Sequence, residues 1–362
     1  MPYSAADERF SHQYSRPFDE VHLPDGSWSD RCYFFAHSPD GDLLVTNGYG
    51  NNPNQRRAHG YGKVARADGR PLGPIRCTGC VGADRDDLQA GPMRWTCVEP
   101  LKHWHLELPA NGSGVAWDMH YEPRAPMWEL LPMSLELDGR TILDMYHMKE
   151  SGIWRGWVDI DGERVSVDGW PGGRDRTFGV RVADEIDWWI WLDIGFADRA
   201  IQAWVIEAHD GTVHYVDGGV TTPTAPFRSG SSASSIGSSS TATASGRPAS
   251  ARLHRRGRRH AAGDRHGAAS GRRRLLRPPD EGFTLNRWAT VRCSCAAWDS
   301  SDPEVLATVE SQSMSIDQLM RFETDGMVGH GIFEILSGGA GHGRYPNWPV
   351  MDMSKFRQHA AE

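Results

Sequence analysis

The chain has 362 residues, of which 39 are Lys or Arg and 47 are Asp or Glu, so its formal net charge is −8. That length allows two ordinary domains with real cores, and an acidic body disfavours a nucleic-acid footprint over the folded surface. No basic and then apolar leader opens the chain and no run of about 18 apolar residues occurs, so we expect a cytoplasmic protein without stable membrane insertion.

Short strands joined by tight turns are expected along most of the chain. Asp-Gly and Asn-Gly pairs supply the positive φ angles that hairpin turns need, and they occur at 25–26, 40–41, 68–69, 111–112, 138–139, 161–162, 210–211 and 325–326. Between them, apolar and polar residues alternate with period two at 31–38, 42–49, 103–110, 116–123, 164–170, 187–196 and 201–209. Only residues 313–322 leave the predicted secondary structure ambiguous. The pattern predicts an all-β fold.

The alternation in the first half also assigns side chains to faces. On one face lie Trp104, Leu106, Leu108, Trp117, Met119 and Tyr121, and on the other lie His103, His105, Glu107, Asp118, His120 and Glu122. A barrel separates an interior from an exterior in this way, although the pattern leaves open which face is interior. The 15 tryptophans fit either thick aromatic cores or an apolar ligand cavity.

Histidines and cysteines raise the question of a metal. His103 and His105 alternate on one predicted strand and could bind a metal with Glu107, His120 or His147, but the solvent-facing side of a strand is the simpler interpretation, and we expect no metal. Because no second C-x-x-C pair follows Cys77 and Cys80, the six cysteines are expected to be free thiols.

The composition changes abruptly at residues 228–282. This stretch holds 12 arginines against three acidic residues, a net charge of +9, while the remainder carries −17 from 27 basic and 44 acidic residues. Strand patterning and aromatic residues are missing from it, which is typical of a disordered linker. A lysine-free Arg/Ala/Ser/Gly composition is also what a GC-rich gene yields when it is read out of frame, and both interpretations remain open.

Three stretches together resemble a known family. They are WSDRCYFFAHSPDGDLLVTNGYGNNPN near the start, GPMRWTCVEPLKHWHLEL in the first half, and ESGIWRGWVDIDGERVSVDGWPGGRDRTFGVR in the second. Together with GMVGHGIFEIL they resemble two-domain lipocalin-like proteins related to carotenoid 1,2-hydratase. The glycine-rich stretch departs from the family motif at Arg176, where histidine is usual, and at Phe178, where tryptophan is usual.

The resemblance implies two tandem lipocalin-like barrels or sandwiches at residues 15–135 and 136–350, the second interrupted by 228–282. It also implies a hydrophobic small-molecule ligand of isoprenoid, steroid or polyketide type and no cofactor. Since Arg176 replaces the family's histidine, the expected function is ligand binding. The alternative is a hydratase, lyase or cyclase that acts by acid protonation of an alkene.

The candidate site centres on GWPGGRDRTFGVR, residues 169–181. Its arginines and aspartate could form an ion-paired corner, or Asp175 could be the catalytic acid of an apolar cavity, where burial raises a carboxyl pKa. Aromatic walls would stabilise a carbocation through cation–π contact. The expected ligand-binding residues are Trp117, Tyr121, His147, Trp170, Arg174, Arg176, Arg181, Trp189 and Trp191.

Overall fold

The computed structural model describes residues 4–10, 25–66, 71–80, 84, 86–182, 186–208, 210–222, 234–235, 294–297, 315–324 and 326–337. Within these ranges the chain forms strands and one short 3-10 helix, η1, at Pro53–Gln55. The predicted all-β fold is therefore confirmed. The predicted linker at 228–282 lies outside the described residues, apart from Ser234–Ser235.

The strands follow the predicted alternation closely. Residues 313–322, ambiguous from sequence, contribute to strand β19, whereas the predicted strand at 164–170 ends at Ser166. The strands are β1 Trp28–His37, β2 Leu43–Asn52, β3 Arg57–Arg66, β4 Pro71–Cys80, β5 Leu88–Ala90, β6 Met93–Glu99, β7 His103–Leu108, β8 Val115–Pro123, β9 Trp128–Glu129, β10 Met133–Leu137, β11 Arg140–Ile160, β12 Glu163–Ser166, β13 Trp170–Arg181, β14 Trp188–Gly195, β15 Ala200–Glu207, β16 Val213–Thr221, β17 Ser234–Ser235, β18 Ser294–Ala297, β19 Ser315–Thr324 and β20 Met327–Ser337.

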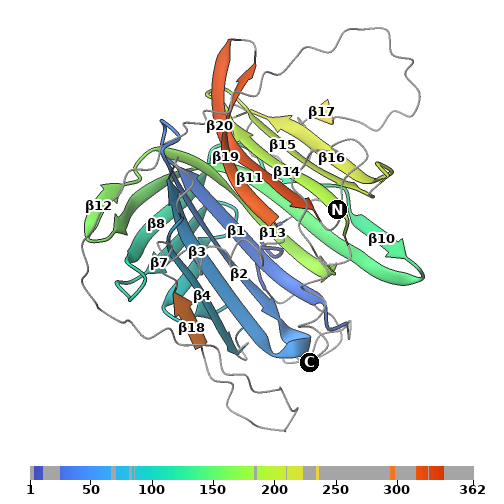
Figure 1. The fold of residues 1–362 in the computed structure, drawn as a ribbon, viewed down its shortest axis with the longest axis horizontal. Coiled ribbons are helices and arrows are strands. Elements are labelled where there is room, and N and C mark those ends of the chain that lie inside the picture. Colours follow the sequence, from blue (N-terminus) through green and yellow to red (C-terminus); the bar gives the residue numbers. More distant parts are fainter. Residues whose placement is uncertain are drawn as a thin grey trace, which may run out of the picture.

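Two antiparallel sheets result, and Figure 1 shows them side by side. The larger, sheet A, has the order β18-β4-β3-β2-β1-β13-β11-β8-β7-β6-β5, with β9, β10 and β12 paired to β11. Its far end returns toward its start, because β5 lies against β2, β3 and β4, so sheet A is a nearly closed barrel. The smaller, sheet B, has the order β17-β16-β15-β14-β20-β19.

Strands β1 and β11 of sheet A each contribute to two cores. One core fills the barrel with residues such as Phe34, Trp104 and Trp154. The other lies between the sheets, where Tyr33 and Phe35 of β1 pack in one cluster with residues of sheet B. Period-two alternation explains this division, because neighbouring residues of a strand point to opposite sides. The predicted apolar face, with Trp104 and Tyr121, is the barrel interior.

Turn chemistry accounts for the hairpins around β11. Asp138 and Gly139 have φ of 50° and 74° between β10 and β11, and Asp161 and Gly162 have φ of 55° and 88° between β11 and β12. Two consecutive positive φ angles are the backbone of a type I′ hairpin turn, which Asp-Gly adopts at low cost. The sequence prediction of turns at these two pairs is confirmed.

Sheet A extends past the predicted domain boundary at 135/136, because β11 and β13 lie between β1 and β8. The two-domain division itself stays a prediction. Cys77 is disulfide-bonded, so the expectation of free thiols is wrong for this residue, whereas Cys32 and Cys97 are free. The pairing of β4 with β18, which places Cys295 opposite Cys77, joins segments too distant in sequence for spacing to reveal. No helix in the described ranges is long and apolar enough to cross a membrane.

Candidate functional site

Strand β13 divides the glycine-rich stretch between the two sides of sheet A. Arg174 and Arg176 point into the barrel, where they meet Glu8 and Asp30. Asp175 and Thr177 point to the opposite side, toward the space between the sheets, where both face His147. The alternation of one strand therefore separates the arginines from the aspartate that the sequence analysis grouped with them.

Arg174 is held by two carboxylates inside the barrel. Its Nε donates to Glu150 Oε2 at 2.7 Å, and its two terminal nitrogens donate to the two oxygens of Glu8 at 2.7 and 3.1 Å. Trp104 Nε1 also donates to Glu8, at 3.1 Å, and Tyr121 donates its hydroxyl proton to the Glu150 carbonyl oxygen at 3.0 Å. These are charge-assisted and bidentate contacts, which fix the packing of the barrel.

Arg176 makes a second buried ion pair, with Asp30. It also donates to the backbone carbonyl oxygens of Arg31 and Arg9, each at 3.0 Å, and lies over the Phe10 ring with 3.6 Å between the guanidinium carbon and the ring centroid. The residue that replaces the family's histidine is therefore a packing and ion-pairing residue of the barrel, and it does not face Asp175.

The candidate site is the polar and aromatic space between the sheets, which we call the intersheet site. Asp175 Oδ2 lies 3.5 Å from His147 Nε2, and Thr177 Oγ1 lies 2.8 Å from His147 Nδ1. Trp191 Nε1 donates to His147 Nε2 at 3.3 Å. Since that nitrogen accepts a hydrogen bond, the proton of a neutral imidazole sits on Nδ1 and is donated to Thr177. Burial and the charges of Lys149 and Arg181 lower the His147 pKa well below its usual range, which agrees with a neutral ring.

Asp175 keeps limited contact with water. Its side chain keeps 13% of its surface exposed, while the neighbouring His147 side chain keeps 2%. Burial raises the pKa of the Asp175 carboxyl to about 7, against the charges of Lys149, Arg181 and Arg176, which lower it. At neutral pH this carboxyl group can therefore either donate or accept a proton.

Lys149 is fully buried beside Asp175. Its Nζ donates to the backbone carbonyl oxygens of Leu192 and Ala203 at 2.6 and 2.9 Å, and lies 3.6 Å from the centroid of the Trp191 ring. Burial lowers the Lys149 pKa to about 7, while Asp193 and Asp175 raise it. The ammonium group thus ties sheet A to the backbone of sheet B.

Aromatic rings enclose the intersheet site. Tyr33 and Phe35 of β1 meet the edge of Trp191 with ring centroids 5.9 and 6.5 Å apart, and Trp204 lies 4.6 Å from the His147 ring. Trp189 packs on Trp204 at 5.7 Å and donates its Nε1 proton to Glu334 at 2.6 Å. The surroundings of Asp175 and His147 on this side of sheet A are therefore mainly aromatic.

Several buried polar atoms around the intersheet site have no hydrogen-bond partner among the described residues. They are Arg31 Nε, Arg181 Nε, the Tyr33 hydroxyl and Trp204 Nε1. Burial and the charge of Arg181 lower the Arg31 pKa to about 9, so the two guanidinium groups stand close together near Asp175. Buried donors left without partners are costly, which makes a bound polar group their natural acceptor.

The predicted site residues fall into two groups. Asp175, His147, Arg181, Trp189 and Trp191 meet at the intersheet site, whereas Trp117, Tyr121, Trp170, Arg174 and Arg176 belong to the barrel interior. Arg31, Tyr33, Thr177, Asp193 and Trp204 were not among the predicted site residues. Single polar residues inside apolar runs, such as Asp193 within DWWIWLDIGF, are the signal that could have pointed to them.

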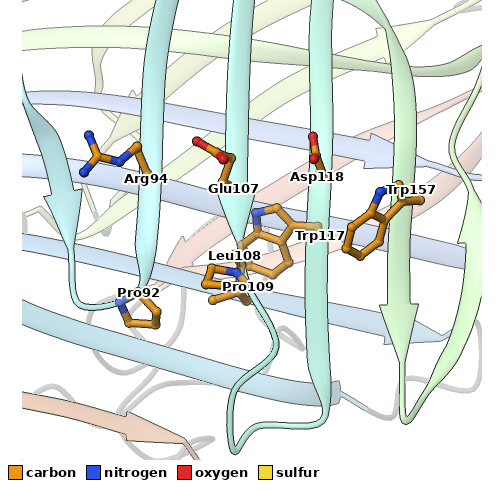
Figure 2. Close-up of a pocket in the computed structure, with 8 residues that line it drawn as sticks. All are labelled: Pro92, Arg94, Glu107, Leu108, Pro109, Trp117, Asp118 and Trp157. Atoms are coloured by element: carbon orange, nitrogen blue, oxygen red, sulfur yellow. The ribbon is translucent and has the colours of Figure 1, made fainter.

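A separate hollow lies on the outer face of the barrel. It encloses about 350 Å³, and Figure 2 shows Arg94, Glu107 and Asp118 in a row across neighbouring strands, with Trp157 beside them. Its other lining residues are Pro92, Leu108, Pro109 and Trp117. Charged and apolar side chains both line this hollow, and none of the intersheet residues line it.

Comparisons with known proteins support the fold. A family model described as "Family of unknown function (DUF8625)" matches residues 4–266, and no curated protein matches the chain. The chain is similar to a crystal structure described as a candidate AttH (NE1406) from Nitrosomonas europaea, at 11% identity and a TM-score of 0.54, covering 86% of this chain and 92% of that one.

Two other solved structures are less similar. Kievitone hydratase from Nectria haematococca has 14% identity and a TM-score of 0.41, covering 59% of this chain and 68% of that one. CghA with Sch210972 has 11% identity and a TM-score of 0.40, covering 58% and 64%. These two likenesses are too weak to support a conclusion about this chain. The specific relation to carotenoid 1,2-hydratase stays a prediction.

Proposed function

The chain belongs to DUF8625, a family of unknown function, and we propose that it is an acid–base enzyme of hydratase or lyase type that acts on a largely apolar small molecule in the intersheet site. The observation that carries the proposal is the Asp175 carboxyl group, with its pKa raised to about 7 and 13% of its side chain exposed among aromatic rings. A group that titrates near the working pH is well suited to general acid–base catalysis.

The charges around Asp175 decide which kind of intermediate fits. Lys149 already lies over the Trp191 ring, and Arg31 and Arg181 add two more cations. A carbocation, as alkene protonation would form, is repelled by these charges, whereas a developing oxyanion is stabilised by them. We therefore favour a substrate whose C=C bond is conjugated to a carbonyl group over an isolated alkene.

In this reaction a water molecule adds across the conjugated double bond. The Asp175 carboxylate takes one proton from water as its oxygen bonds to the β-carbon, and the alkene electrons move onto the carbonyl oxygen. The unpaired donors of Arg31, Arg181 and Tyr33 stabilise that oxyanion. Asp175 then returns its proton to the α-carbon, so that water is added overall, and the reverse sequence eliminates water.

Among the expected ligand classes, polyketide-type molecules fit best. The aromatic walls suit any isoprenoid, steroid or polyketide, but the unpaired donors need a polar acceptor on the ligand. Conjugated carbonyl groups are common in polyketides and supply that acceptor. Ligand binding without catalysis is the simpler function. It does not require a titratable, partly exposed carboxyl group such as that of Asp175.

Hydrogen–deuterium exchange at the α-carbon of a ketone tests this proposal. The purified full chain would be incubated in D₂O with benzylacetone, a steroid 3-ketone and an acylphloroglucinol, and exchange followed by NMR. We expect catalysed exchange of at least one ketone, with a rate that rises as pH increases through about 7, because the Asp175 carboxylate is the active form.

Matched variants identify the group responsible. Asp175→Asn should reduce the rate by about 10²–10⁴-fold, the usual contribution of a general acid or base. Asp138→Asn, at an exposed turn, should leave it unchanged. Thermal shift with the same ketones measures binding alone. Binding without exchange, a rate that falls with rising pH, or full activity in Asp175→Asn would each contradict the proposal.

A further inference from the structure

We propose that the outer face of β7 and β8 carries a divalent transition-metal site, with His105, His120 and Asp118 as ligands and an open coordination position toward the neighbouring hollow. The site is independent of the intersheet site. It lies on the outer side of the barrel wall, on strands that Figure 1 shows away from sheet B. Zinc is the metal class that a His₂-carboxylate ligand set suits.

The three ligand atoms already converge. His105 Nε2 lies 2.8 Å from Asp118 Oδ1, His120 Nε2 lies 3.6 Å from the same oxygen, and one ligand atom from each residue lies within 4.8 Å of the other two. Metal–ligand bonds of about 2.0–2.1 Å in a tetrahedral site place neighbouring ligand atoms roughly 3.4 Å apart. Small rotations of the side chains are enough to reach that geometry.

The backbone register produces this convergence. His105 lies directly opposite His120, and Glu107 directly opposite Asp118, on adjacent antiparallel strands. The two imidazole rings are therefore parallel, with centroids 4.2 Å apart and an interplanar angle of 4°. On the other face of these strands Trp104 and Leu106 are buried in the barrel core, which fixes the strands in place.

One hydrogen bond and one nearby carboxylate beyond the ligands support the same assignment. A histidine that binds a metal through one nitrogen usually directs its other N–H to a carboxylate or another acceptor. His120 Nδ1 lies 2.9 Å from His103 Nε2, and His105 Nδ1 lies 3.8 Å from Glu107 Oε2. These contacts leave both Nε2 atoms facing Asp118, so a metal ion would replace the proton that His105 now shares with that carboxylate.

The site is accessible to a metal ion and to a further ligand. The side chains of His105, His120 and Asp118 are 23%, 37% and 44% exposed. Asp118 also lines the hollow of about 350 Å³ in Figure 2, with Glu107 and Arg94 beside it. Three protein ligands with an open fourth position are typical of metals that bind water or a small molecule.

Metal titration of the full chain tests the proposal. Isothermal titration with ZnCl₂ should show one site of higher affinity than the rest, and CoCl₂ should give the intense visible absorption of four-coordinate Co²⁺. His105→Ala and His120→Ala should each abolish both signals. His103→Gln should weaken binding by about 10–100-fold, the usual effect of losing a hydrogen-bond partner of a ligand.

Because the chain has 16 histidines, a control elsewhere is needed. His214→Ala, on an exposed part of β16, should leave the titration unchanged. Circular dichroism and the melting temperature show whether each variant is folded, and Asp118→Asn gives a second, milder test. Wild-type protein that binds neither metal, or binding in the His105→Ala/His120→Ala double variant equal to wild type, would overturn the proposal.

Discussion

Asp175 and its two arginine neighbours differ in what their side chains can still do. Arg174 and Arg176 have ion-pair partners inside the barrel, and both are almost fully buried. Among the described residues the ion-pair partner of Asp175 is His147, at 3.5 Å, and the Asp175 side chain keeps contact with water. Adjacent residues of one strand therefore lie in different surroundings: the arginines stabilise the barrel, and the aspartate is the proton-transferring group of the proposed function.

The raised pKa of Asp175 predicts a pH-dependent cost to stability. Its folded pKa is about 7 against an ordinary 3.8, so the folded state binds more protons between these values and stability falls as pH rises from about 4 to 7. A shift of this size corresponds to roughly 4 kcal/mol. Asp175→Asn removes the cost, so the variant should be more stable than wild type at pH 8.

Urea unfolding at pH 4 and pH 8 checks this prediction. The two proteins should have similar free energies of unfolding at pH 4, where Asp175 is protonated in the folded wild type. Glu150, whose pKa burial also raises to about 7, is present in both proteins and cancels in the comparison. An Asn variant less stable than wild type at pH 8 would show that the carboxylate is stabilised instead.

Only part of the site could be predicted at the residue scale. Asp175, His147, Arg181 and two tryptophans were identified because each stands out within a motif or an aromatic run. Arg31 and Tyr33 join them only through the pairing of β1 with β13, and strand pairing between distant segments leaves no mark in a single sequence. The ion pair between Arg176 and Asp30 could be identified only from the structure.

At the scale of the element, β13 depends on glycines where two neighbouring strands approach it. A Cβ on Gly172 would come within 2.1 Å of the Phe35 carbonyl oxygen on β1, and one on Gly173 within 3.0 Å of the Glu150 carbonyl oxygen on β11. These contacts leave room only for hydrogen, because backbone atoms cannot move aside as a flexible side chain can. The motif's glycines are thus required by close packing on both sides of the strand.

Gly172→Ala should therefore destabilise the fold strongly. Overpacking usually costs about 1–3 kcal/mol, and contact with backbone should put this variant at the upper end of that range or beyond it. Gly112→Ala is the matched control, since nothing lies within 4 Å of the position that its Cβ would take. Melting temperatures measured by circular dichroism compare the two variants, and equal values would refute the packing argument.

The strands themselves were largely predictable, because alternation and Asp-Gly turns are local signals. The run RCYFFAHS became part of β1 and DWWIWLDIGF part of β14. Which face of a strand points inward was not predictable for His103 and Trp104, since both faces of sheet A are partly covered. The order of the strands in the sheets depends on long-range pairing and could not be read from spacing.

At the scale of the whole molecule, the central strands of sheet A hold the two cores together. Along Trp28–Ala36, β1 pairs with Val180–Gly172 of β13, and β13 pairs in turn with β11. Any break between residues 135 and 140 separates β1 from these neighbours. The expected domain boundary at 135/136 can therefore be tested directly, by asking whether the N-terminal fragment folds without β11 and β13.

A fragment of residues 1–135 should not fold by itself. It lacks β11 and β13, so β1 and β8 would each expose an unpaired edge and the barrel core would open to water. A fragment of residues 1–182 restores both strands and should show more dispersed amide signals in NMR spectra. A well-dispersed spectrum from residues 1–135 would establish the predicted N-terminal domain and refute this expectation.

The pKa of Asp175 in the folded protein is the most direct test of its proposed role in proton transfer. NMR titration of the side-chain carboxyl carbons in the full chain, compared with Asp175→Asn to assign the signal, gives this value without any assumption about the substrate. We predict a pKa of about 7 for the Asp175 carboxyl group, because it is buried between the two sheets. A value near the ordinary 3.8 would mean that Asp175 is a plain carboxylate at neutral pH and would contradict its role as the proton-transferring group.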